Sequence, residues 1–198
     1  MKHYLFGVVV IVFMLGGISF ASQYQIGFKA SHEAVGAEFN YIRESGYGSL
    51  STGVNILFND DEYTILKGNF MLSGDPFLPG LRYGVGFEPI IGKIENRKGS
   101  RDGDLLAFGF LFQMAYDLYS SQWKVPVDVI MDLCFAPDPL TSNESTLYTG
   151  VKACVEYRIL INASISCEYR YTRADFEYSG RDWELSDHIY LLGYTMRF

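Results

Sequence analysis

Residues 161–172 read INASISCEYRYT, and this stretch decides the fold. Apolar or aromatic side chains and one thiol occupy every second position, and polar or charged side chains fill the positions between them. One face carries Ile161, Ala163, Ile165, Cys167, Tyr169 and Tyr171, and the other carries Asn162, Ser164, Ser166, Glu168, Arg170 and Thr172. A period of two residues predicts a β-strand with one apolar and one polar face.

The same alternation recurs along the rest of the chain. It is clear at residues 81–88, 106–117 and 125–135, and weaker at 24–30, 35–43, 50–58, 63–72 and 147–157. With a closing strand at 188–198, the count is about ten, and eight stays open because the first four are short. The 15 Tyr, 15 Phe and 20 Gly suit pleated, curved strands. No nucleic-acid partner is expected, because the net charge is -7.

The bulk of the apolar face decides which way it points. About ten strands, several with five or six large side chains on one face, carry more Phe and Tyr volume than the inside of a closed barrel holds. The large side chains must therefore face lipid. We predict an all-β fold, a transmembrane antiparallel up-and-down β-barrel, with a soluble lipocalin-like barrel as the alternative.

The first 21 residues predict export. They combine Lys2, an apolar run and a small-x-small pattern at Ser19 and Ala21, which is typical of a cleaved secretory signal peptide. The alternative is a retained membrane anchor. The predicted domain is then residues 22–198, located in the outer membrane and in contact with its lipid. The three cysteines, Cys134, Cys154 and Cys167, are expected to be free thiols.

The chain ends within its last predicted strand. Five side chains of that strand point to the lipid face: Tyr190, Leu192, Tyr194, Met196 and Phe198. A final strand that closes on Phe resembles the signal by which bacterial outer-membrane barrels engage their assembly machinery. The resemblance implies that this machinery is a partner during insertion.

Residues 130–198 resemble the YfaZ family of outer membrane proteins. The matching pieces are Phe135 to Leu140, Glu156-Tyr157-Arg158, Glu168 to Tyr171 and Met196-Arg197-Phe198. The resemblance implies a Gram-negative outer-membrane β-barrel, and no established activity comes with it. The aromatic strand from Leu106 and the three cysteines depart from the family pattern.

Charged residues of both signs fall on the predicted inner face. Because they lie on neighbouring strands, we expect cross-strand ion pairs in a narrow lumen, either as a structural filling or as the lining of a conducting path. The predicted network consists of Lys152, Glu156, Arg158, Glu168, Arg170, Asp128, Asp132, Glu38, Arg82 and Glu88.

No enzyme, cofactor or metal site is predicted. A hydrolase at the outer rim is the weaker alternative, with His188 or His32 as base and Ser186 or Ser31 as nucleophile, although Asp187 and His188 should point to opposite faces. Three dispersed His residues give no ligand spacing for a metal, and Asp60-Asp61-Glu62 is expected to be a solvated loop.

Connection lengths predict the orientation. Long polar loops at residues 95–104, 136–146 and 173–187 are expected outside the cell, with short turns in the periplasm. Phe176, Tyr178 and Trp183 in the last loop are candidate anchors for an external ligand or, alternatively, simple packing over the barrel mouth.

Overall fold

The computed structural model describes residues 22–45, 48–60, 62–74, 78–96, 101–178 and 181–198. The predicted signal peptide lies outside these residues, so its cleavage stays a prediction. Within the described residues, eleven strands and a single 3-10 turn, η1 (Asp138–Leu140), account for the regular structure. The strands are β1 (Ser22–Ala30), β2 (Ala34–Ser45), β3 (Gly48–Asn59), β4 (Tyr63–Gly74), β5 (Leu81–Asn96), β6 (Arg101–Asp117), β7 (Val127–Ala136), β8 (Thr141–Asn143), β9 (Ser145–Leu160), β10 (Ala163–Tyr178) and β11 (Arg181–Arg197).

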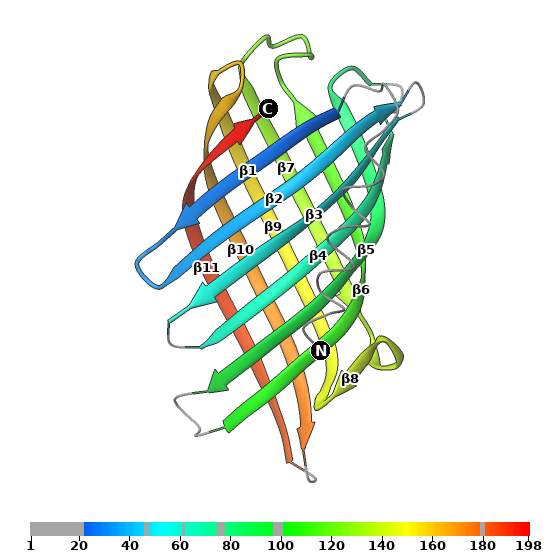
Figure 1. The fold of residues 1–198 in the computed structure, drawn as a ribbon, viewed down its shortest axis with the longest axis vertical. Helices are drawn as coiled ribbons and strands as arrows, with labels where there is room; N and C mark the ends of the chain where they lie inside the picture. The colour runs from blue at the N-terminus through cyan, green and yellow to red at the C-terminus, as the bar shows by residue number, and fades with distance from the viewer. Residues whose placement is uncertain (1–21, 46–47, 61, 75–77, 97–100, 179–180) are drawn as a thin grey trace, which may run out of the picture.

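Ten of these strands close into an antiparallel barrel (Figure 1). Each pairs with its neighbour in sequence, except that β7 pairs with β9, and the ring closes where β1 pairs with β11. The three-residue β8 stands apart from the ring and pairs with β6 beyond the end of β7. The predicted ten-stranded barrel is confirmed.

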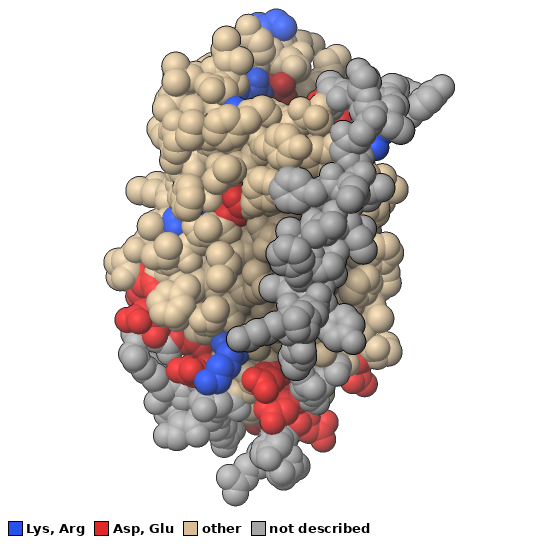
Figure 2. Space-filling view, in the orientation of Figure 1, with Lys and Arg blue, Asp and Glu red and all other residues tan. Residues whose placement is uncertain are grey.

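The outer surface of the barrel is an apolar belt. Side chains such as Phe28, Leu72, Phe112 and Leu192 are exposed, as expected for groups that face lipid. In Figure 2 most of the lateral surface is uncharged, and the charged groups collect mainly toward the two ends. Among the described residues, no helix is long and apolar enough to cross a membrane.

The strands continue beyond the predicted boundaries at one end of the barrel. The prediction of long loops at 95–104 and 173–187 is wrong, because β5 runs to Asn96, β6 begins at Arg101, and β10 and β11 are separated by two residues alone. The connection at 118–126, at the opposite end, is longer. Connection length therefore does not support the predicted orientation.

The cause of this error is a change in the phase of the alternation. Up to Tyr171 the apolar side chains of β10 point outward, whereas Ala174 and Phe176 point inward and are buried. The phase therefore shifts by one position while pairing with β11 continues without interruption. An interrupted alternation looks like a loop in the sequence, although the backbone remains extended.

Candidate functional site: the interior of the barrel

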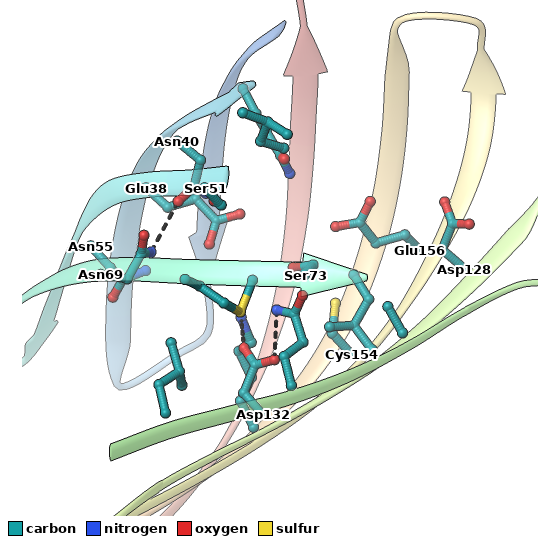
Figure 3. A pocket seen from close by; sticks show the side chains of 18 of the residues that line it. Glu38, Asn40, Ser51, Asn55, Asn69, Ser73, Asp128, Asp132, Cys154 and Glu156 are labelled. Carbon is teal, nitrogen blue, oxygen red and sulfur yellow. Dashed lines mark hydrogen bonds and ion pairs between the residues drawn. The ribbon is translucent and has the colours of Figure 1, made fainter. Parts of the chain in front are cut away.

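The interior is divided into a polar half and an apolar half. The polar half is a chamber of about 430 Å³ whose lining reaches the strand ends at the same end of the barrel as the C-terminus, at Gln23, Ser49, Ser73 and Arg197 (Figure 3). We call it the chamber. The apolar half fills the other end, and we call it the seal.

The centre of the chamber is a buried ion-pair cluster around Glu168. Lys29 donates to Glu168 at 2.6 Å and to Glu38 at 2.9 Å, and Arg170 forms a second ion pair with Glu168. Glu168 itself is fully buried. Arg170 also donates to Asn55 of β3 at 3.1 Å, a contact that joins β10 to β3 through the interior. Each buried charge in this cluster has a partner, which offsets the cost of taking it out of water.

Two further pairs extend the cluster along the wall formed by β7 and β9–β11. Lys152 lies 2.5 Å from Asp132, which also accepts a hydrogen bond from Gln113 at 2.9 Å. Closer to the rim, Arg197 pairs with Glu156, and Ser164 donates to the same carboxylate at 3.1 Å.

Other pairs stand at the top and the bottom of the chamber. At the rim, Arg158 pairs with Asp128 and lies 2.6 Å from Asp117. At the border with the seal, Lys67 lies 3.0 Å from Glu88 and 5.1 Å from the centre of the Tyr148 ring. The remaining residue of the predicted network, Arg82, also lines the chamber. The structure thus brings the ten predicted residues to one interior surface, and Lys29, missing from the predicted network, joins two of them.

The charges of the chamber balance. Its lining contains seven Lys and Arg side chains and six Asp and Glu side chains, and Glu168 behind them brings the carboxylates to seven. A balanced set of close pairs has no net charge with which to attract ions of one sign. The geometry therefore favours a structural network over a selective ion path.

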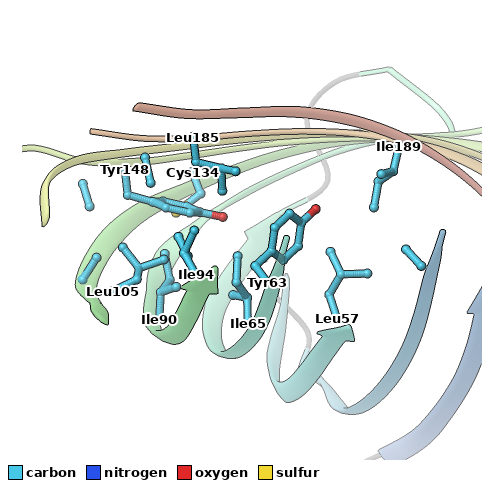
Figure 4. Close-up of a cluster of buried hydrophobic side chains, with 14 of the residues drawn as sticks. Leu57, Tyr63, Ile65, Ile90, Ile94, Leu105, Cys134, Tyr148, Leu185 and Ile189 are labelled. Carbon is cyan, nitrogen blue, oxygen red and sulfur yellow. The ribbon is translucent and has the colours of Figure 1, made fainter. Parts of the chain in front are cut away.

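The seal is a hydrophobic core between two facing walls of the barrel (Figure 4). Leu57, Ile65 and Ile94 from β3–β5 lie opposite Leu185 and Ile189 from β11, all fully or almost fully buried. Further buried members are Tyr63, Ile90, Leu105, Ala107, Leu111, Ala136, Tyr148, Ala174 and Leu191. A core of this kind leaves no room for a column of water.

Phe176 and Trp183 close the far end of the seal. Their rings stack with centroids 4.3 Å apart and planes at 12°. Phe176 is 1 % exposed and Trp183 packs against the same core. Of the two alternatives for these residues, packing over the barrel mouth fits the structure, and a surface anchor at Phe176 does not. The side chain of Tyr178 lies outside the described residues. The change in the phase of the alternation made these strands look like a loop in the sequence. The same change is the sequence signal from which an inward-facing apolar core could have been predicted.

A polar contact joins the two walls of the seal. Asp187 of β11 accepts hydrogen bonds from Tyr63 at 2.6 Å and from Asn59 at 3.3 Å, so β11 is tied to the tip of the β3–β4 hairpin. The donors are side chains of the opposite wall, because β11 and β4 are not neighbours in the ring.

The residues of the predicted rim hydrolase do not assemble. His188 lies on the outer face, and its Nδ1 is 2.8 Å from the hydroxyl of Tyr169, whereas Asp187 points inward. Ser186 donates to Tyr171, and His32 pairs with Glu33. Among the described residues, no group of three His, Cys, Asp or Glu could hold a metal ion. The three cysteines are free.

The closing strand carries its predicted apolar side chains on the outer face, and Tyr190, Leu192 and Phe198 are the most exposed of them. The backbone of Phe198 exchanges hydrogen bonds of 3.0 and 2.8 Å with Tyr24. The last residue therefore completes the closure of the ring between β1 and β11.

A closed ten-stranded antiparallel barrel with an apolar outer belt and a charged interior defines the class: it is a β-barrel of the outer-membrane type. The chain is similar to several solved structures. For the NanC porin the identity is 15 %, covering 89 % of this chain and 99 % of that chain, with a TM-score of 0.48. For Neisserial surface protein A (NspA) the identity is 10 %, the coverage 89 % and 94 %, and the TM-score 0.37.

The translocator domain of the autotransporter NalP from Neisseria meningitidis is 11 % identical, with 100 % and 95 % covered and a TM-score of 0.26. No protein-family model matches the chain, and no curated protein matches it. The resemblance to the YfaZ family stays a prediction, and the class rests on the geometry of the barrel itself.

Proposed function

We propose that this protein is a structural outer-membrane barrel, not an enzyme, with a hydrated chamber open to the periplasm and a closed outer end, and that it conducts no ions at rest. The observation that carries the proposal is the seal, a packed apolar core that occupies the interior beyond Lys67 and Glu88. An ion on this path would lose its hydration without meeting a charged partner, which costs several kcal/mol or more.

The closing strand supports the proposed orientation. Phe198 directly follows β11 at the chamber end of the barrel, and a terminal strand closing on Phe resembles an assembly signal. We infer that the barrel assembly machinery engages this strand from the periplasm. In an assembly assay, Phe198→Ala should slow insertion while Phe28→Ala, an exposed aromatic on β1, should leave it unchanged. Equal insertion rates for wild type and Phe198→Ala would contradict the inference that the assembly machinery engages this strand.

Conductance of the purified protein in planar bilayers tests the closed state. Wild-type protein should give no steady steps at moderate voltage, because the seal excludes water. Steady open channels of porin size would contradict the proposal.

Thiol labelling tests where along the interior water is excluded. In a background with the native cysteines replaced by Ala, a charged thiol reagent should modify Ser73→Cys at the chamber rim. Ala174→Cys, at a fully buried position in the seal, should resist the reagent in the folded protein and react after unfolding. Similar rates at the two positions in the folded state would show that water passes the seal.

A further inference from the structure

β11 extends far past its neighbour on one side. Its pairing with β1 stops at Ala30 opposite Leu192, whereas its pairing with β10 continues to Tyr178 opposite Arg181. Residues 181–191 therefore have a paired strand on the β10 side alone among the described residues. This free edge is about 37 Å long at the usual rise of about 3.4 Å per residue.

The hairpins of the opposite wall meet β11 through side chains. Tyr63 and Asn59 reach the inward carboxylate of Asp187, and Gly103 lies against the inward Trp183. These contacts use the inner face of β11. The outward side chains of Glu184, Ser186 and His188 remain exposed, and no backbone hydrogen bond joins 181–191 to any described strand other than β10.

An unpaired strand edge is a template for a further strand. Its alternate N–H and C=O groups point sideways and can bind an extended peptide through main-chain hydrogen bonds, while side chains set the specificity. The side chains around this edge are acidic. Asp182 and Glu184 lie on the outer face of β11, with Asp175 and Glu177 beside them on β10, and Figure 2 shows carboxylates gathered at this end.

We propose that the free edge of β11 binds an extended cationic peptide by strand addition. Lys or Arg side chains on the outer face of the peptide would meet Asp182 and Glu184, and apolar side chains on its inner face would extend the layer formed by Leu185 and Ile189. The Arg173 guanidinium on this face is already paired with Asp175 at 3.0 Å and Glu184 at 3.1 Å. The proposal does not depend on whether the barrel conducts.

A second copy of the chain fits this edge poorly. In a neighbour inserted in the same membrane, β11 would run in the same direction across the bilayer, so the two edges could not pair antiparallel. It would also bring a second set of carboxylates to the contact, and like charges in register are unfavourable.

Binding to the full chain in detergent micelles tests the proposal, with a ten-residue peptide of alternating Lys and Val as the probe. Two further peptides carry N-methyl groups on the odd or on the even backbone amides. Strand addition uses the amides of one set, so one methylated peptide should bind like the parent and the other should lose binding. Hydrogen exchange at the amides of residues 182–191 should slow on binding.

Matched charge reversals separate the edge from general attraction to an acidic surface. Asp182→Lys combined with Glu184→Lys should weaken binding about tenfold or more, whereas Asp138→Lys combined with Glu44→Lys, two exposed positions away from this edge, should change it less than about twofold. No binding of the parent peptide, equal binding of both methylated peptides, or equal losses in the two charge-reversal variants would each overturn the proposal.

Discussion

The chamber and the seal occupy the same barrel but are held together in opposite ways. In the chamber, charged and amide side chains point inward and many of them are joined in close pairs, and the outer face is apolar. In the seal, the inward side chains are Leu, Ile, Phe and Trp, and outward positions such as Asp182 and Glu184 are acidic. Along β10 and β11 the wall changes from a membrane pattern to that of a water-soluble sheet pair.

The difference separates the part of the barrel wall that is surrounded by lipid from the part that is surrounded by water. Within the bilayer, lipid covers the outside, so polar groups must pair with one another inside. Beyond the bilayer, water surrounds the wall, and apolar side chains are buried in the interior as in a β-sandwich. The border inside the barrel runs through Lys67, Glu88 and Tyr148, where the cation lies against the aromatic ring.

The largest expected effect comes from breaking the centre of the chamber. Glu168→Gln removes the carboxylate that pairs with Arg170 and one of the two that pair with Lys29. The free energy of unfolding should therefore fall by about 3–5 kcal/mol. Urea unfolding in lipid vesicles measures it. Glu177→Gln, on the exposed part of the same strand, is the matched control, and an equal loss in both variants would show that the cluster is not stabilising.

The next effect tests the seal. Phe176→Ala should cost about 3–4 kcal/mol, because it leaves a cavity under Trp183. Phe112→Ala on the lipid face loses the same side chain, but lipid can fill the space, so about 2 kcal/mol is expected. If the lipid-facing variant proved the more destabilised of the two, the seal would not be a packed core.

A smaller effect is expected for the tie across the seal. Tyr63→Phe removes one donor to Asp187 and leaves Asn59, so the loss should be about 1–2 kcal/mol. Tyr83→Phe, on the exposed outer face of β5, should change the unfolding free energy very little. Identical values for the two variants would place Asp187 outside the stabilising contacts.

The smallest effect is expected for an ion pair on the water-exposed surface. Lys93 lies 3.2 Å from Glu95, and both side chains are more than half exposed. Lys93→Ala should change stability by less than about 1 kcal/mol, because water and salt screen such a pair. A loss as large as that of Glu168→Gln would mean that burial does not separate the two kinds of pair.

Much of the chamber could be predicted from the sequence, and little of the seal. The faces of strands such as 161–172 follow from a period of two, so Lys152, Glu168 and Arg170 were assigned to the interior from their spacing. Lys29 was missed because one charge in a short, weakly patterned strand gives no sign of its partners. Phe176 and Trp183 were assigned to a loop because their alternation is out of phase with the preceding strand.

By itself, the sequence determined the class of fold, the approximate strand number and which face of most strands meets lipid, because these depend on local alternation and side-chain volume. The tertiary structure decided how far the strands continue, where the interior changes from charged to apolar, and which residues meet through the lumen. Those features depend on the register at which the ring closes, and register brings Tyr63 to Asp187 and Lys29 to Glu168 over separations in sequence that no local pattern records.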